Sequence, residues 1–136
     1  MTDADNGTRR APIPARKGVA VKTASFFAYI GPGRVSIARF PPRQIPAGFR
    51  VYRGLAPGPW FKSVDEAEYR LRYDRQLSEL DPQLVWDELH ALAGSAEPVL
   101  LCWERKHDLE AGRTFCHRRI VAAWFAATLK HDVAEV

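Results

Sequence analysis

Apolar residues along the chain form short clusters typical of β-strands and longer periodic stretches typical of helices. The first cluster, Val19–Tyr29, is rich in β-branched and aromatic residues and predicts a strand. It ends at the turn Gly31-Pro32-Gly33. A second strand is expected over Val35–Phe40, because the following Pro41-Pro42 offers no N–H to a sheet ladder. The run Pro98–Trp103 is apolar without alternation, which predicts a strand buried on both faces of a parallel sheet.

Two helices are expected between the second and third strands. Ser63 and Glu66 have the spacing of a capping box, and apolar residues from Tyr69 onward then recur every three or four positions. Asp81-Pro82 combines a capping carboxylate with a first-turn proline, which predicts the start of the second helix. Gly94 is expected to end it.

A third helix is expected after the polar loop that follows the buried strand, with Thr114 as its cap. Its sheet-facing side should carry Ile120, Val121, Trp124, Phe125 and Thr128. Strands that alternate with helices predict an α/β fold, a single compact domain in which helices pack on a small, mostly parallel sheet. This domain should span residues 18–136. Residues 1–17 lack an apolar period and are expected to be a flexible tail.

The segment 41–61 carries five prolines, and no long regular element is expected there. Long connections of this kind are more often functional than idle. Basic and aromatic residues alternate in and beside it: Arg39, Arg43, Phe49, Arg50, Tyr52, Arg53, Trp60 and Phe61. Two interpretations stay open: the aromatic side chains pack onto the core, or the loop contacts a ligand or a nucleic acid.

Composition narrows the class of protein and of partner. A chain of 136 residues with 46% hydrophobic residues suits one globular domain. No apolar run is long enough to span a bilayer, so we expect a soluble cytoplasmic protein without a membrane partner. The net charge of +4 favours an anionic partner, either a phosphate-bearing small molecule or a nucleic acid. Nothing in the sequence indicates the oligomeric state.

The chemistry of the chain is expected at the ends of the strands. Ligands of open α/β sheets bind beyond the carboxyl ends of the strands. Arg39 lies at the end of the second predicted strand, and Cys102-Trp103-Glu104 at the end of the buried one. The last helix begins with Cys116-His117-Arg118-Arg119, and its free N–H groups should point to the same edge. The sequence therefore predicts an anion-binding corner.

Within this corner, Glu104, Cys116 and His117 are the candidate catalytic residues. A thiol at a helix start beside a histidine should have a lowered pKa, and a desolvated carboxyl can act as an acid or a base. The candidate ligand-binding residues are Arg39, Cys102 and Arg118. Plainer alternatives remain: buried packing for Cys102, a structural histidine, and a salt bridge from Glu104 to an arginine. The two cysteines are expected to be thiols rather than a disulfide.

Three chemistries can be compared. A thiol phosphatase is excluded because Arg105 follows Cys102 too closely to bracket a phosphate loop. Cys102, His107, Cys116 and His117 lack a familiar paired zinc spacing; we predict no metal or cofactor, although the spacing leaves metal binding open. A hydrolase or transferase acting on a nucleotide, nucleoside or nucleic acid fits the corner better. The alternative is a non-catalytic module that binds nucleic acid or protein.

Several motifs are spread over the segment from Lys22 to Val133. They are Val35–Pro42, Leu55-Ala56-Pro57, Glu68-Tyr69 with Tyr73, Leu80-Asp81-Pro82, Leu100–Glu104, and Cys116–Arg119 with Trp124. Together these motifs resemble the uncharacterised "domain of unknown function" family numbered four-eight-eight. The resemblance implies a compact α/β fold from bacteria or their phages and carries over no accepted activity. The connection between Glu104 and Cys116 is longer here than the short acidic connection associated with the family.

Overall fold

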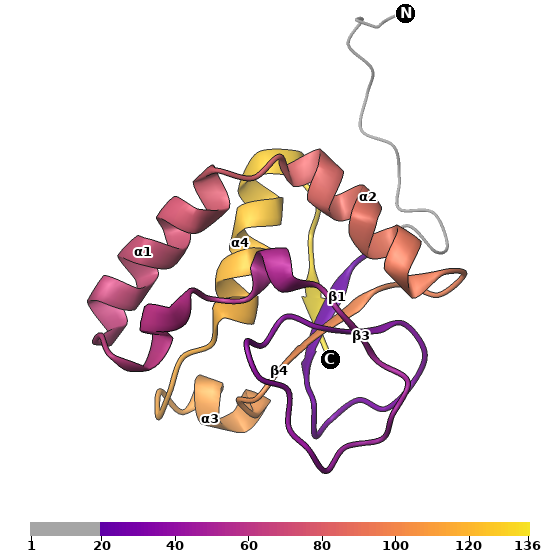
Figure 1. The fold of residues 1–136 in the computed structure, drawn as a ribbon, viewed down its shortest axis with the longest axis horizontal. Coiled ribbons are helices and arrows are strands. Elements are labelled where there is room, and N and C mark those ends of the chain that lie inside the picture. Colours follow the sequence, from indigo (N-terminus) through magenta and orange to yellow (C-terminus); the bar gives the residue numbers. More distant parts are fainter. Residues whose placement is uncertain (1–19) are drawn as a thin grey trace, which may run out of the picture.

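Five short strands form one parallel sheet in the order β3-β2-β4-β1-β5 (Figure 1). The computed structural model describes residues 20–136, so the predicted tail over residues 1–17 lies outside the described part. In chain order the strands are β1 (Lys22–Ser25), β2 (Arg34–Ser36), β3 (Arg50–Val51), β4 (Val99–Cys102) and β5 (Ala134–Glu135).

Strand β4 lies at the centre of the sheet. Leu100 pairs with Thr23 of β1 on one side and with Val35 of β2 on the other. All four residues of β4 are buried, as expected for an apolar run without alternation. The predicted α/β fold with a parallel sheet is therefore confirmed.

Within the described residues, four α-helices and two 3₁₀ turns accompany the sheet. The 3₁₀ turns are η1 (Arg53–Leu55) and η2 (Pro59–Lys62), and the helices are α1 (Glu66–Ser78), α2 (Pro82–Ala93), α3 (Lys106–Glu110) and α4 (His117–Leu129). Helices α2 and α4 contact the sheet, and α1 packs on α4 (Figure 1). Within residues 20–136, no helix has both the length and the apolar character needed to cross a membrane.

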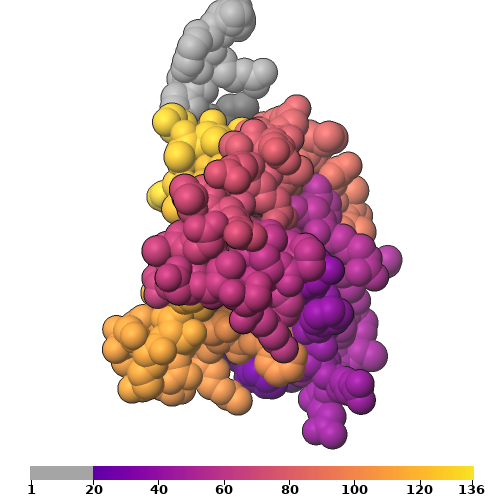
Figure 2. Space-filling model, turned by 60° about the vertical axis from the view of Figure 1, so that its left-hand side comes forward, coloured from indigo at the N-terminus to yellow at the C-terminus, as the bar shows by residue number. Residues whose placement is uncertain are grey.

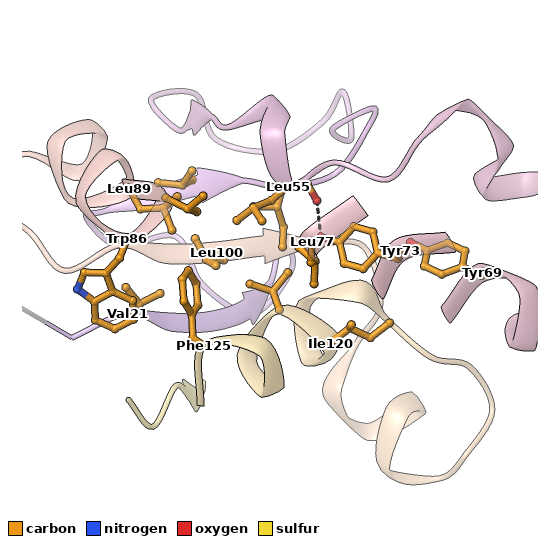
Figure 3. Packing of buried hydrophobic residues seen from close by; sticks show 14 residues of the cluster. Val21, Leu55, Tyr69, Tyr73, Leu77, Trp86, Leu89, Leu100, Ile120 and Phe125 are labelled. Atoms are coloured by element: carbon orange, nitrogen blue, oxygen red, sulfur yellow. Dashed lines mark hydrogen bonds between the residues drawn. The ribbon is translucent and has the colours of Figure 1, made fainter. Parts of the chain in front are cut away.

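The main core lies between the sheet and these helices (Figure 3). Leu100 points to this face and packs with residues such as Phe125 and Tyr73. The buried Tyr73 hydroxyl donates a 2.6 Å hydrogen bond to the Leu55 carbonyl, which ties η1 to α1. Strand alternation directs Val99 and Leu101 to the opposite face, where residues of the loops, including Phe26 and Ile45, cover them.

The helix caps agree only partly with the predictions. Asp81 caps α2, accepting a 3.0 Å hydrogen bond from the Gln83 N–H, as predicted. The predicted Ser63 capping box is wrong: Ser63 ends η2, and Asp65 caps α1 instead. The predicted Thr114 cap is also wrong, because α4 begins after Cys116, whose side chain makes no capping hydrogen bond.

Other boundaries also differ from those predicted. The first two strands are shorter, because the chain turns away from the sheet after Ser25 and Ser36. The segment 41–61 contains β3, η1 and the start of η2, and the connection after β4 contains α3. Strand β5 was not predicted, and Thr128 is exposed rather than facing the sheet.

Candidate functional site

The carboxyl ends of β1, β2 and β4 lie side by side at one edge of the sheet. Cys102 pairs with Ser25, and its carbonyl accepts a 3.0 Å hydrogen bond from the Phe26 N–H. The Ile37 N–H donates to the Leu101 carbonyl at 3.1 Å. The segments that follow these strands therefore surround one edge, and the start of α4 joins them there, as the sequence predicted.

A pocket of about 480 Å³ opens at this edge. Figure 2 shows the neighbouring surface, where η2 and α1 (magenta) meet the connection between β4 and α4 (orange). The volume lies in the range of about 300–1,000 Å³ that small-molecule sites occupy. The lining residues come from five segments of the chain: Ala38, Arg39, Phe40, Pro57, Phe61, Lys62, Tyr69, Cys102, Trp103, Glu104, Thr114, Phe115, Cys116 and His117.

Aromatic rings make up much of the pocket wall. Tyr69 packs edge-on against Phe115, with ring centroids 4.9 Å apart, and Phe40 packs against Phe61. The Trp103 indole N–H donates a 2.7 Å hydrogen bond to the Phe40 carbonyl and thereby links two lining segments. These contacts give the pocket flat apolar surfaces, and most of its exposed lining is apolar.

Two cations and one carboxyl interrupt the apolar wall. Arg39 is half-buried and donates a 3.3 Å hydrogen bond to the Pro57 carbonyl, and Lys62 lies over the Phe61 ring. Glu104 is also half-buried. Burial raises the pKa of the Glu104 carboxyl above its ordinary value, while a backbone hydrogen bond and the charge of Arg118 act in the opposite direction. The Glu104 carboxyl therefore favours its protonated form more than a solvated glutamate does.

Cys102 and Cys116 are joined by a disulfide, so the predicted pair of thiols is wrong. Neither cysteine is free, and the low-pKa thiol expected at Cys116 does not exist in this form of the protein. The two segments come together because β4 ends directly beside the start of α4. The sequence placed both cysteines at this edge, but no pattern across the fourteen positions between them indicated that their sulfur atoms would be bonded.

His117 is buried beneath the pocket with its ring fixed at one end. Its Nε2 lies 2.7 Å from the Ile37 carbonyl oxygen, and because a carbonyl only accepts, Nε2 must carry the hydrogen. Burial, assisted by the charge of Arg118, lowers the pKa of His117 to about 4. The imidazole is therefore neutral near pH 7, and its Nδ1 lone pair points toward Cys116 Sγ, 4.0 Å away.

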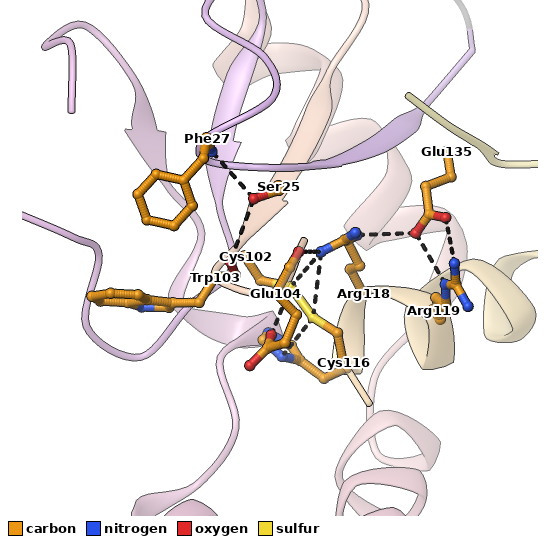
Figure 4. Close-up of polar contacts among 10 residues, drawn as sticks. Ser25, Phe27, Cys102, Trp103, Glu104, Cys116, Arg118, Arg119 and Glu135 are labelled. Carbon is orange, nitrogen blue, oxygen red and sulfur yellow. Dashed lines mark hydrogen bonds and ion pairs between the residues drawn. A yellow bond between two sulfur atoms is a disulfide. The ribbon is translucent and has the colours of Figure 1, made fainter. Parts of the chain in front are cut away.

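Arg118 lies behind the pocket wall and not among its lining residues (Figure 4). Its side chain is fully buried. Nη1 donates to the Glu104 carbonyl at 2.6 Å and lies 3.4 Å from Cys102 Sγ, while Nε donates to a Glu135 carboxylate oxygen at 3.2 Å. Arg118 thus links the backbone after β4 to β5 and supports the pocket wall formed by the end of β4 and the start of α4.

Glu135 is a site residue that the sequence did not reveal. It belongs to β5 and binds both Arg118 and Arg119, the latter at 2.7 Å (Figure 4). A two-residue strand is too short to leave a periodic pattern. Sequence reasoning also missed Lys62, Tyr69 and Phe115 as pocket residues, because nothing in their local sequence distinguishes pocket-lining from core positions.

Comparisons with protein families, with curated proteins and with solved structures found no match for this chain. Membership of the family that its motifs resemble therefore stays a prediction.

Proposed function

We propose that the chain is an enzyme, a hydrolase or transferase that acts on a nucleotide or nucleoside bound in the pocket. The observation that carries the proposal is the lining of the pocket: aromatic walls, two cations and a half-buried carboxyl around one cavity of about 480 Å³. A nucleotide presents a flat ring, an anionic group and a reactive bond between them. The three kinds of lining residue suit these three parts.

The aromatic walls favour a planar ring. Stacking on an aromatic side chain contributes roughly 1–3 kcal/mol per nucleobase and works with any base. Trp103 and Phe40 are substantially exposed, so their faces are open to a ligand. Tyr69 and Phe115 are fixed by edge-on contacts, and Phe61 packs against Phe40 at a tilt, which keeps the walls in place without the ligand.

The cations favour an anionic group at the mouth of the pocket. Arg39 has one protein acceptor, Pro57, among the described residues, which leaves further N–H groups for a phosphate. Lys62 is exposed and reaches the same pocket. In this proposal Arg39 keeps its predicted role as a ligand-binding residue, and Lys62 takes the place of Arg118.

Glu104 is the reacting carboxyl in this proposal, because it is the only carboxylate among the residues that line the pocket. During hydrolysis it would accept a proton from the attacking water. The water oxygen would form a bond to the reacting atom as the bond to the leaving group breaks with its electron pair going to that group. The leaving group would then take up the proton that Glu104 had accepted. The neutral, fixed His117 would position the Ile37–Phe40 segment through the Ile37 carbonyl rather than transfer protons.

A binding experiment tests the pocket. The four nucleoside monophosphates and their nucleosides would be titrated into the chain at low salt while tryptophan fluorescence is recorded, since Trp103 lines the site. We expect Arg39→Ala to weaken binding of a monophosphate about tenfold and to leave the nucleoside unaffected. Arg43→Ala is the matched control, because Arg43 is exposed and outside the pocket. No binding of any of these compounds at millimolar concentration would refute the proposal.

A turnover experiment tests Glu104. Any compound that binds would be incubated with the chain, and release of base or phosphate followed by chromatography. Glu104→Gln keeps the size of the side chain and should lower turnover at least about a hundredfold while preserving binding. Unchanged turnover in this variant would remove Glu104 from the reaction.

A single-stranded nucleic acid is a second candidate substrate, supported by exposed aromatic residues outside the pocket. Phe27 packs edge-on against Trp103 at 6.2 Å, and Arg105 lies 4.5 Å over the Phe27 ring. The loop 41–61 contributes less to this candidate. Its aromatic residues Tyr52, Trp60 and Phe61 pack against the core, which favours a packing role for that segment over contact with a nucleic acid. An oligonucleotide that binds more tightly than its mononucleotide, with affinity falling steeply with salt, would support this candidate.

A further inference from the structure

Cys102, Cys116 and His117 bring two sulfur atoms and one ring nitrogen to within 4.8 Å of one another. All three residues are buried, and all three line the pocket. Thiolate sulfur and neutral imidazole nitrogen are donors that zinc-class ions prefer. In the disulfide form the sulfurs have no thiolate to offer, so this donor set becomes complete only on reduction.

The orientation of His117 independently favours a ligand at this place. Its Nε2–H is bound by the Ile37 carbonyl at 2.7 Å, which leaves the Nδ1 lone pair facing the sulfurs. A metal-bound histidine usually donates its other ring N–H to a carbonyl or a carboxylate in this way, which fixes the tautomer and the ring plane. The nucleotide pocket by itself would not require this orientation.

The surroundings of the sulfurs also suit metal-binding thiolates. Nη1 of Arg118 lies 3.4 Å from Cys102 Sγ and 3.8 Å from Cys116 Sγ, and a guanidinium at this distance stabilises the thiolate form. Thiolates rather than thiols are the forms that bind metal ions. Two thiolates also balance the charge of a divalent ion, so the loaded site adds no net charge to the buried wall.

The separation of the two backbones fits a shared ion. The Cα atoms of Cys102 and Cys116 lie 7.4 Å apart. Most disulfides join Cα atoms that are roughly 4.4–6.8 Å apart. Two sulfurs on one tetrahedral ion, each about 2.3 Å from the metal, lie roughly 3.8 Å from each other and therefore suit a wider backbone separation.

We propose that reduced Cys102 and Cys116, together with His117, bind a zinc-class divalent ion whose fourth position opens into the pocket beside Glu104. A thiol reductant cleaves the disulfide to two thiols and is itself oxidised to a disulfide. The ion then displaces both thiol protons as it binds. Three protein ligands with one open position is the arrangement of catalytic zinc sites. The inference goes beyond the proposed function, because binding of the ion requires no substrate.

The test uses the full chain, reduced with a phosphine, freed of metal and titrated with Co²⁺ without oxygen. We expect thiolate-to-cobalt charge-transfer absorption that saturates at a single ion per chain and disappears when Zn²⁺ is added. The untreated disulfide form should give no such absorption. Cys116→Ser should weaken binding at least about tenfold. His107→Ala is the matched control, because His107 is exposed and outside the donor set, and should bind as the wild type does.

Folding is checked in parallel by circular dichroism, so that a loss of cobalt binding in a folded variant is attributed to the missing ligand. Absence of charge-transfer absorption in the reduced wild type would overturn the proposal, as would wild-type affinity in Cys116→Ser.

Glu104→Gln should change cobalt affinity less than about threefold. A larger loss would make Glu104 a ligand and overturn the open fourth position. If the chain binds cobalt but no nucleotide, the proposed function is refuted and the metal site is not. If it binds a nucleotide but no cobalt, the metal site is refuted and the proposed function is not.

Discussion

The wall formed by the end of β4 and the start of α4 has two sides with opposite properties. On the pocket side, Arg39 and Lys62 retain unused hydrogen-bonding capacity, and the Glu104 carboxyl faces the cavity. On the far side, Arg118 is fully buried and bound to protein acceptors, chiefly Glu135 and the Glu104 carbonyl. The comparison shows that neighbouring segments at one edge of the sheet supply both a surface suited to a ligand and the support that holds this surface.

The difference in burial between Arg118 and Arg39 explains why the two sides of the wall differ. A buried charge must be paired, because the loss of its hydration otherwise costs several kcal/mol. Arg118 meets this requirement in part: Nε binds Glu135 and Nη1 binds the backbone after β4, while the buried Nη2 has no hydrogen-bond partner among the described residues. Arg39 lies nearer to solvent and needs no such pairing. Arg118 therefore mainly joins parts of the fold, and Arg39 keeps N–H groups for the proposed ligand.

Arg118→Ala should have the largest effect on stability. It removes a buried cation from the partly buried carboxylate of Glu135, and breaking a buried pair from one side costs about 3 kcal/mol or more. Urea unfolding would measure this loss. Arg119→Ala is the matched control, because Arg119 binds the same carboxylate from an exposed position and should cost about 1 kcal/mol or less. Equal losses of unfolding free energy in the two variants would contradict the distinction between the buried and the exposed arginine.

Reduction of the disulfide should have the next largest effect. The bond closes a loop between positions 102 and 116, and a loop of this length contributes roughly 3 kcal/mol by restricting the unfolded chain. Unfolding in urea with and without a phosphine, with a chelator present, would measure the difference. Added Zn²⁺ should restore part of the loss in the reduced chain if the metal site exists. An unchanged midpoint on reduction would show that Arg118 alone maintains the wall.

Glu135→Gln should destabilise the protein in a pH-dependent manner. The hydrogen bond from Arg119, together with the charge of Arg118, holds the pKa of Glu135 below its ordinary value. A carboxyl with a lowered folded-state pKa stabilises the fold above its unfolded pKa, and the effect is lost as the pH falls through the folded value. We expect a cost of about 2 kcal/mol near pH 7, because Gln keeps an acceptor for Arg118 but not the charge that pairs with it. This cost should shrink as the pH falls below the ordinary glutamate pKa and through the lowered folded-state value.

Chemical unfolding at several pH values would follow this difference between wild type and Glu135→Gln. Glu79→Gln serves as the control, because Glu79 is exposed, and should show no such dependence. A difference that persists undiminished into acid would assign the effect to packing rather than to charge.

Arg39→Ala should have the smallest effect on stability, within about 0.5 kcal/mol of the wild type. Its side chain makes one long hydrogen bond and a contact with the exposed Phe40 ring. The same variant is expected to lose affinity for nucleoside monophosphates. A loss of stability comparable with that of Arg118→Ala would place both arginines in the structural half of the wall.

The central elements of the fold could be predicted from the sequence, and the peripheral ones could not. The unbroken apolar run of β4 and the Asp81-Pro82 start of α2 depend on local chemistry, and both predictions are confirmed. Strands β3 and β5 contain two residues each and derive their structure from the neighbours with which they pair. Asp65 took the place of Ser63 as the α1 cap, although both residue types cap helices well, because η2 extends to Ser63.

The site could be located from the sequence more accurately than its contacts. Strand ends and a helix start placed Arg39, Glu104, Cys116 and His117 at one edge, and the structure brings all four to one pocket. The direction of each side chain depends on tertiary partners that the sequence does not specify. Arg118 points away from the pocket because Glu135 lies behind it, and no local pattern indicates that carboxylate.

The order of strands in the sheet determines when the protein can fold during synthesis. Strands β1 and β2 are close in the sequence, but they do not pair with each other; both pair with β4, which is made more than sixty residues later. Until the ribosome has released the chain through Cys102, both strands lack their central partner and expose unpaired edges. Pairing across such a distance in sequence is slow, because the connection must be ordered first. The nascent chain therefore passes through a long period in which α1 and α2 have been made but the pocket has not been assembled.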